Sequence, residues 1–238
     1  MTALSGSGYF LNCYNIVMEQ IIFVDKPSGM TSFGAVARVR RILSQQEGHK
    51  VKVGHTGTLD PFATGLLILL AGKATKKAPE LTKLDKVYEA TIRLGATSST
   101  GDPEGEITIT DEQPAISREQ LERALAAFIG EIEQTPPAFS AIKINGQRAY
   151  KLARAGKSVE IPTRKVTIYS LDILNYQSPY LTIRTHVSSG TYIRTLAEDI
   201  GKALGCGAYC TALRRTKIAD YDINQLPLFK LPAWHAKN

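Results

Sequence analysis

The chain of 238 residues is poor in cysteine and contains no long apolar run. Three cysteines cannot build a disulfide framework, so we expect a protein of the reducing cytoplasm. Apolar runs such as residues 21–24 and 66–71 are far shorter than the roughly 20 residues of a membrane helix, and we expect no membrane contact. Repeats and low-complexity tracts are lacking as well. These absences exclude secreted disulfide scaffolds, membrane-spanning proteins and solenoids.

One arrangement of residues raises the question of a metal site. Cys206 and Cys210 lie four residues apart, and His186 lies upstream of them. The spacing matches no common zinc pattern, and a free cysteine is most often a small buried side chain. We therefore interpret both cysteines as free thiols and expect no metal.

Two segments resemble phosphate-binding motifs, but neither meets the requirements of the motif. Residues 65–73 contain a Gly-Lys pair, but the glycines are seven apart, and Ala74 stands where a P-loop needs Ser or Thr to hold magnesium. Residues 54–57 match the GXXG clamp of RNA-binding KH modules. That clamp needs a helix on either side, whereas here a proline-containing loop follows. We expect no cofactor.

The charge balance bears on the partner. Lysine and arginine number 29 against 22 acidic residues, which gives a net charge of +7 and a pI near 9.3. The excess favours a polyanionic partner, because each phosphate contact releases condensed counterions. A mildly basic enzyme without a nucleic-acid partner has a similar composition, so charge alone leaves both interpretations open.

Apolar spacing predicts three helices. The first follows a cap at Thr31 or Ser32. The second begins with a capping box of Ser117 and Gln120, and Gly130 is expected to end it. The apolar residues that share a face are Val36, Val39 and Leu43 in the first helix, Leu121, Leu125 and Phe128 in the second, and Ile193, Leu196, Ala197, Ile200 and Leu204 in a third that starts near Thr191.

Shorter segments predict strands. Residues 66–70, which glycines flank, are typical of a strand buried on both faces. Residues 87–94 alternate between apolar and polar side chains, and this places Tyr88 on the inward face. We expect an α+β fold with a mixed, mostly antiparallel sheet flanked by helices. Strands are expected at residues 21–24, 66–70, 87–94 and 181–187, with turns between antiparallel strands at 99–105 and 175–180.

Residues 54–65 are the densest candidate for a functional loop. They hold three glycines, a proline, His55 and Asp60 within twelve residues, which is incompatible with a regular element. A rigid loop ahead of a buried strand is a natural platform for functional side chains. The alternative is a tight connector in which Asp60 only caps a turn beside Pro61.

Two basic features follow later in the chain. Arg194 lies in the first turn of the third helix, where the helix dipole opposes a cation, so it invites a carboxylate or phosphate partner. An ordinary surface arginine is the alternative. Residues 213–217 form a basic cluster, which predicts either a solvated face or a phosphate contact.

These segments together resemble the TruB family of tRNA pseudouridine-55 synthases. A single such motif would be weak evidence, but six of them follow one another in family order between about residue 20 and residue 220. The matching blocks are residues 25–32, 54–65, 86–95, 135–150, 189–194 and 213–216.

The resemblance implies an activity and roles for particular residues. It implies that a uridine in the T-loop of tRNA, at position 55, is isomerised to pseudouridine without a cofactor. Asp60 would be the nucleophile, Arg194 would pair with it, and Tyr88 would stack on the target base and move its C5 proton. The remaining implied contacts are Tyr192 and Leu213 lining the uridine pocket, His55 packing against the displaced T-loop, and Lys26 supporting the catalytic loop from below.

The pairing of Arg194 with Asp60 has a physical motive. Burial can raise the pKa of an Asp by up to about 3–5 units, which would leave the carboxyl protonated and inert. A cation within about 4–6 Å lowers that pKa by roughly 1–3 units. We expect Arg194 to keep Asp60 charged and oriented, since a guanidinium offers a bidentate fork and does not deprotonate.

The ends of the chain bear on its domains. Residues 1–17 predict an irregular extension, since they lack the pattern of a signal peptide, and residues 18–238 predict a single catalytic domain. Relatives carry a C-terminal PUA domain that grips tRNA. Only 22 residues (217–238) follow Thr216, and a domain usually needs about 50, so we expect no PUA domain. Pro227, Pro232 and Trp234 predict a tail over the core.

Two other functions remain open. One is a tRNA-binding folding chaperone with vestigial catalysis, which the intact Asp60, Tyr88 and Arg194 disfavour. The other is a pseudouridine synthase relative directed by a guide RNA, which the expected lack of a PUA domain disfavours. We therefore expect a monomer that acts on tRNA through its T-arm and needs no guide RNA.

Overall fold

The computed structural model describes residues 19–140, 142–144, 146–155 and 161–232. The extension expected at residues 1–17, the start of the expected domain at Met18, and Trp234 of the expected tail lie outside these residues. The described part of the tail does cover the core, because Phe229 N donates to Phe23 O at 2.7 Å and both Phe229 and Leu231 pack against buried side chains.

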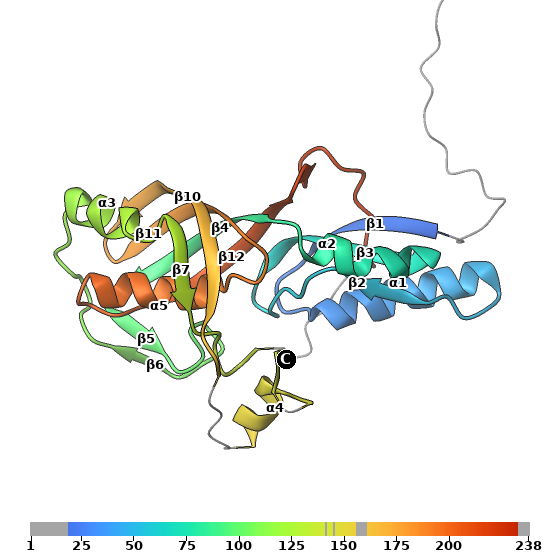
Figure 1. Cartoon of the computed structure of the whole chain (residues 1–238), viewed down its shortest axis with the longest axis horizontal. Helices are drawn as coiled ribbons and strands as arrows, with labels where there is room; N and C mark the ends of the chain where they lie inside the picture. The colour runs from blue at the N-terminus through green and yellow to red at the C-terminus, as the bar shows by residue number, and fades with distance from the viewer. Residues whose placement is uncertain (1–18, 141, 145, 156–160, 233–238) are drawn as a thin grey trace, which may run out of the picture.

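A twisted sheet runs the length of the molecule (Figure 1). Its strands are paired antiparallel except for β3 and β12, which run parallel, so the expected α+β class with a mixed, mostly antiparallel sheet is confirmed. In spatial order the strands are β1 (Glu19–Lys26), β3 (Thr64–Gly72), β12 (Ala208–Ile218), β4 (Lys86–Leu94), β11 (Tyr180–Val187), β10 (Arg164–Gln177) and β7 (Gly130–Gln134), with β2 (Val53–His55) beside β3 and β13 (Tyr221–Asp222) beside β12.

Helices α3 and α5 lie toward one end of this sheet and α1 and α2 toward the other, whereas α4 lies apart, at the bottom of the view (Figure 1). Apolar residues of α1 and α5 belong to the same buried cluster, so both helices cover one face of the sheet. The described helices and remaining strands are α1 (Ser32–Glu47), the 3-10 helix η1 (Lys73–Lys77), α2 (Ala78–Thr82), α3 (Arg118–Ala126), α4 (Ala149–Arg154), α5 (Ile193–Ala203), and the hairpins β5 (Ala96–Ser98) with β6 (Ile107–Ile109) and β8 (Lys143–Ile144) with β9 (Gln147–Arg148). In the described part of the chain, no helix has the length and apolarity needed to cross a bilayer.

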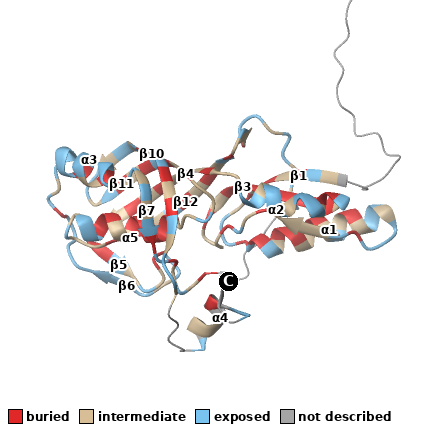
Figure 2. Cartoon of the chain, in the orientation of Figure 1, coloured by how far each residue is buried: buried red, intermediate tan, exposed pale blue. Residues whose placement is uncertain are grey.

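Strand β3 is buried on both faces, as the sequence predicts, and Figure 2 shows the buried residues of the sheet in red. Its odd-numbered residues, such as Leu67 and Leu69, join the cluster under α1 and α5. Its even-numbered residues, such as Leu66 and Ile68, join a second cluster with α2 and the segment after β12. Gly65 precedes this run with a φ of 104°, and a Cβ there would lie 2.3 Å from Arg215 O, so only glycine fits.

Several local predictions are confirmed, and others are wrong in detail. Thr31 caps α1, and α3 has the complete capping box of Ser117 and Gln120. However, α3 ends at Ala126, so Phe128 lies beyond it. Gly130 does not end the helix but begins β7, because its φ of 107° turns the chain into the strand. The functional loop is also shorter than residues 54–65, since residues 53–55 form β2.

Candidate active site

The loop that carries Asp60 is fastened by the segment between β1 and α1. The hydroxyl of Ser32 accepts a hydrogen bond from Leu59 N and donates one to Leu59 O, both at 2.8 Å. Gly29 N donates to Pro61 O at 2.8 Å. A buried hydroxyl that satisfies both main-chain groups of one residue holds that residue as a strand partner would. The loop residue next to Asp60 is therefore fixed in place.

Lys26 lies beneath the same loop. Its side chain is fully buried, and its ammonium donates to Met30 O at 2.6 Å, Pro27 O at 2.9 Å and Pro61 O at 3.2 Å. Burial lowers the pKa of Lys26 from 10.5 to about 8. The ammonium of Lys26 thus contacts the loop at Pro61, and its support of the loop stays a prediction.

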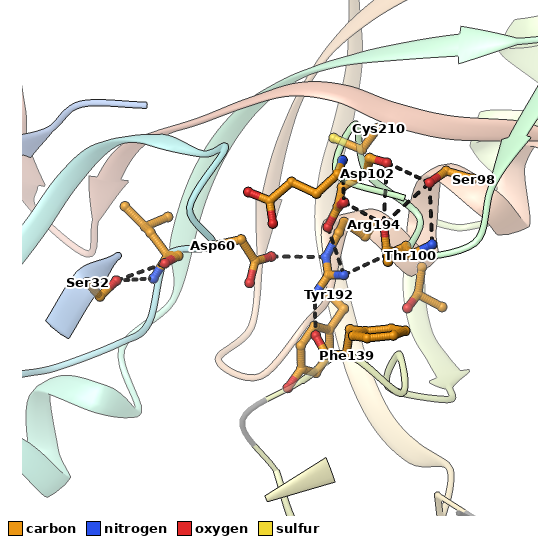
Figure 3. A network of polar contacts seen from close by, with 12 residues as sticks. Ser32, Asp60, Ser98, Thr100, Asp102, Phe139, Tyr192, Arg194 and Cys210 are labelled. Carbon is orange, nitrogen blue, oxygen red and sulfur yellow. Dashed lines mark hydrogen bonds and ion pairs between the residues drawn. The ribbon is translucent and has the colours of Figure 1, made fainter. Parts of the chain in front are cut away.

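Arg194 contacts Asp60 and also a second carboxylate, that of Asp102 (Figure 3). Asp60 Oδ2 lies 2.9 Å from Arg194 Nε, and Asp102 Oδ2 lies 3.0 Å from Arg194 Nη1. The Arg194 side chain is 3% exposed, whereas that of Asp60 is 32% exposed. Arg194 also donates to Thr100 O at 2.7 Å and to Phe139 O at 2.8 Å. One guanidinium is thus held by two carboxylates and two carbonyls, and only Asp60 reaches the open side.

The position of Arg194 follows from the start of α5. Tyr192 is the N-cap residue and lacks a side-chain cap, but its main chain exchanges two hydrogen bonds with the side chain of Gln134, at 2.7 and 3.0 Å. The helix dipole disfavours a cation at this end. Two carboxylates offset that cost, which agrees with the expectation that Arg194 invites an anionic partner.

The sequence does not predict Asp102 as a site residue, because residues 99–105 indicate only a turn. The turn is present between β5 and β6, and its geometry aims the carboxylate at Arg194. Thr100 Oγ1 and Glu104 N donate to Asp102 Oδ1 at 2.6 and 3.0 Å. Gly101 has a φ of 73°, and a Cβ there would lie 2.5 Å from a carboxylate oxygen of Glu198. An Asp next to a turn glycine is too common a pattern to predict such a role.

The charges around Asp60 pull its pKa in opposite directions. Withdrawal from water raises the pKa above the ordinary value of 3.8, and the negative charge of Asp102 raises it further. Arg194 and Lys26 lower it. The net result is a raised pKa, so Arg194 opposes the effect of burial without cancelling it.

A pocket of about 270 Å³ opens beside Asp60 and gathers most of the candidate residues. Tyr88, Tyr192 and Leu213 line it together with Asp60 and Arg194. Tyr88 is buried on the face of β4 that the sequence alternation predicts. The pocket thus offers an aromatic ring and a carboxylate in one small space.

His55 lies on the other side of the loop. It lines a second cavity, of about 590 Å³, which also contacts Asp60 and Arg194. Gly57 N donates to His55 Nδ1 at 3.3 Å. Phe33, at the start of α1, lines this cavity and is 65% exposed. The histidine is therefore adjacent to Asp60 but not on the wall of the 270 Å³ pocket.

The basic cluster at residues 213–217 is divided between the interior and the surface, because Arg215 is buried whereas Lys217 is exposed. Arg215 is fully buried and donates to Leu66 O at 2.8 Å and Gly57 O at 3.1 Å. Arg214 pairs with Asp25 at 2.8 Å, and Lys217 pairs with Asp222 at 2.9 Å. Arg215 is thus used inside the fold, because β12 runs through the centre of the sheet, whereas Arg214 and Lys217 form ion pairs that solvent can reach.

Cys206 and Cys210 are free thiols, as expected. Cys210 is buried, and burial raises its pKa to about 12. His186, the third residue of the suspected metal site, contacts the carboxylate of Asp85, and its ring packs against that of Tyr169 with centroids 4.7 Å apart and planes tilted by 44°. Among the described residues, no group of His, Cys, Asp and Glu side chains is arranged to hold a metal ion.

Comparison with family models gives two adjoining matches. Residues 40–193 match the model of the TruB family pseudouridylate synthase, N-terminal domain. Residues 194–237 match the tRNA pseudouridylate synthase B C-terminal domain. The boundary between the two models falls inside α5, between Ile193 and Arg194.

Curated relatives are similar over most of the chain. The tRNA pseudouridine synthase B of Azoarcus sp. is 48% identical over 206 residues, which are 87% of this chain and 67% of that protein. The protein of the same name from Pseudomonas paraeruginosa is 47% identical over 218 residues, which are 91% of this chain and 70% of that protein. The chain thus spans about two thirds of the length of these relatives.

Solved structures share the fold. A chain from the structure "Crystal Structure of a Cbf5-Nop10-Gar1 Complex" superposes with a TM-score of 0.63 at 31% identity, over 83% of this chain and 48% of that chain. A chain from an H/ACA RNP bound to a substrate RNA containing 2'-deoxyuridine superposes with a TM-score of 0.62 at 28% identity, over 85% of this chain and 48% of that chain.

Proposed function

The chain belongs to the TruB family of pseudouridylate synthases, and from this premise we propose that it converts a uridine in the T-loop of tRNA, at position 55, to pseudouridine. Asp60 is the proposed nucleophile. The relatives named tRNA pseudouridine synthase B are 47 to 48% identical to this chain, whereas the H/ACA-associated chains are 28 to 31% identical. This difference favours tRNA without a guide RNA as the substrate. That the chain acts as a monomer in the cytoplasm is a further part of the proposal.

The reaction is an isomerisation that these side chains can serve alone. The C1′–N1 bond breaks, the uracil turns, and a C1′–C5 bond forms. The proton lost from C5 is matched by the proton that N1 gains, so neither water nor a redox partner is consumed. A carboxylate that attacks the nucleotide must be ionised and must have one face open to the substrate.

The observation that carries this proposal is the Asp60–Arg194 contact of 2.9 Å at the wall of the pocket that Tyr88 lines. The guanidinium holds the carboxylate in one orientation and favours its charged form. Because one third of the Asp60 side chain stays exposed, at 32%, the carboxylate can still reach a substrate. This combination suits nucleophilic attack within a small pocket.

The substrate base must leave its stack to reach Asp60, at a cost of a few kcal/mol. Stacking on an aromatic side chain is worth roughly 1–3 kcal/mol per base and can offset that cost. Tyr88 is the proposed stacking residue, with Tyr192 and Leu213 as further walls of the uridine site. His55, in the neighbouring cavity, is the proposed contact for the loop from which the uridine has been withdrawn.

The test is to incubate the purified protein with transcribed tRNA, without guide RNA or other additives, and to map pseudouridine. We expect one modified uridine in the T-loop. Asp60→Asn should lose activity by a factor on the order of 10³ or more, because the nucleophile is absent. Asp220→Asn is the matched control, since Asp220 is exposed and is not among the residues that line the pocket.

Each alternative has its own outcome in this experiment. Equal pseudouridine from Asp60→Asn and wild type would remove Asp60 from the chemistry. Binding of tRNA without product would favour the chaperone function. Product that forms only after a guide RNA is added would favour a relative of the H/ACA-type enzymes.

A further inference from the structure

The pocket beside Asp60 carries more positive charge than the described carboxylates neutralise. Lys86, Arg164, Arg194 and Arg215 all line it. Asp60 and Asp102 both pair with Arg194, and Asp85, whose charge raises the pKa of the neighbouring Lys86, contacts His186. Among the described residues, the hydrogen-bond partners of the other three cations are main-chain oxygens. Buried cations without an acidic partner are costly, so such a wall favours an anionic ligand.

Arg164, at the start of β10, is the most open of these cations. Its Nη2 donates to Gly190 O, and its guanidinium carbon lies 4.8 Å from the ring centroid of Tyr192. Its Nε is buried and has no hydrogen-bond partner within the described part of the chain. A guanidinium has five N–H donors, and the hydrogen bond to Gly190 O uses one of those on Arg164 within the described residues. Stacking on Tyr192 fixes its plane at the wall of the pocket.

Lys86, at the start of β4, stands on the same wall. Its ammonium donates to Thr82 O at 2.8 Å and to Leu84 O, which caps the carbonyls after α2. An ammonium has three donors, and the described residues accept two of those on Lys86. Burial and the charge of Arg215 lower the pKa of Lys86 to about 8. An anion in the pocket would relieve both effects.

We propose that Arg164 and Lys86 form a phosphate subsite, which binds a phosphodiester that flanks the nucleotide whose base is presented to Asp60. The inference rests on the proposed function for the identity of the ligand as RNA. The two phosphates of a nucleotide flank its ribose, so a base that enters this pocket of about 270 Å³ brings a phosphate to its wall. A guanidinium fork fixed on an aromatic ring and an adjacent ammonium are the donors that phosphate recognition uses.

The first experiment measures binding of a T-arm stem-loop at several salt concentrations, with turnover blocked by Asp60→Asn. Arg164→Gln in that background should weaken binding about 10-fold and lower the slope of log K against log salt by about 1. Lys86→Met should act in the same direction. Lys165→Gln is the matched control, because Lys165 is the next residue of β10, is exposed and pairs with Glu131; its slope should stay that of the parent.

A second experiment locates the phosphate. Stem-loops carry a neutral methylphosphonate at the phosphate 5′ or 3′ of the target uridine. One of them should bind the Asp60→Asn protein about 10-fold more weakly than the natural stem-loop, yet should bind Arg164→Gln with no further loss. If the losses of affinity from the methylphosphonate and from Arg164→Gln multiply when the two are combined, the subsite is overturned. An unchanged salt slope in Arg164→Gln would also overturn it. Arg164→Gln settles the question even if Lys86→Met does not fold, because Arg164 is only partly buried.

The subsite and the proposed function fail in distinguishable ways. Wild-type protein that forms pseudouridine while Arg164→Gln keeps the parental affinity and slope contradicts the subsite alone. Wild-type protein that binds the stem-loop through Arg164 but forms no pseudouridine contradicts the proposed function alone.

Discussion

Arg194, Arg164 and Lys86 line the pocket beside Asp60, and Lys26 lies beneath the loop that carries it, but these four cations are held in different ways. Arg194 is paired with two carboxylates, Asp60 and Asp102. The others are hydrogen-bonded to main-chain oxygens. A cation paired with acids adds little net charge and serves to orient and tune its partner. A cation held by carbonyls keeps its charge available for loop support or for an anion. The substitutions below test this contrast.

Arg194→Lys changes the cation that is paired with carboxylates, and we expect it to have the largest effect. A lysine keeps the charge, but its ammonium cannot reach two carboxylates and two carbonyls in the plane that a guanidinium spans. We expect the rate of pseudouridine formation to fall about 100-fold or more while tRNA binding changes little. Single-turnover kinetics and a binding titration measure the two quantities.

Arg214→Lys is the control for this prediction, since Arg214 pairs with Asp25 and both side chains are 39% exposed. A rate in Arg194→Lys equal to that of wild type would show that the contact with Asp60 does not orient the nucleophile.

Asp102→Asn removes one of the two carboxylates paired with Arg194, and we expect it to change the pH dependence of the reaction. The charge of Asp102 raises the pKa of Asp60, so removing it lowers that pKa. Activity requires ionised Asp60 and is lost as the pH falls through its pKa, so the acid limb of the profile of kcat/KM should move to lower pH. At neutral pH the rate should fall about 10-fold, because Arg194 loses one anchor.

The limb is measured by following pseudouridine formation between about pH 4 and pH 8, with Asp111→Asn as an exposed control. A limb that stays in place or moves upward would contradict the coupling between the two carboxylates.

Lys26→Met tests one of the cations that are hydrogen-bonded to main-chain carbonyl oxygens. Three carbonyl oxygens lose their buried donor, and we expect a loss of about 1–3 kcal/mol in the free energy of unfolding with a smaller loss of rate. The pKa of Lys26 is lowered from 10.5 to about 8, so between these values the unfolded chain binds more protons than the folded one. The free energy of unfolding of wild type should therefore rise with pH in this window.

Denaturant titrations at pH 8 and near pH 10 measure this rise, which should be shallower in Lys26→Met. The same slope in both proteins would mean that Lys26 is not a buried cation.

Ser117→Ala should have the smallest effect, because the capping box of α3 belongs to neither set of cations. We expect about 1 kcal/mol less stability and unchanged kinetics. A change in rate would show that the far end of the sheet is coupled to the pocket.

Much of the fold and of the site was predictable because it depends on local patterns. The alternation in β4 places Tyr88 inward, the apolar run of β3 requires cover on both faces, and the unfavourable dipole at the start of α5 predicts an acidic partner for Arg194. The family motifs carried the choice of Asp60, since a turn aspartate alone has no such specificity.

Tertiary structure decided the features that depend on distant parts of the chain. Asp102 looks like a turn residue until β5, β6 and α5 bring it to 3.0 Å from Arg194. Arg215 looks like part of a basic surface until β12 takes a central place in the sheet and buries it. Burial and pairing of a charge depend on neighbours far apart in sequence, whereas periodicity and capping depend on residues a few positions apart.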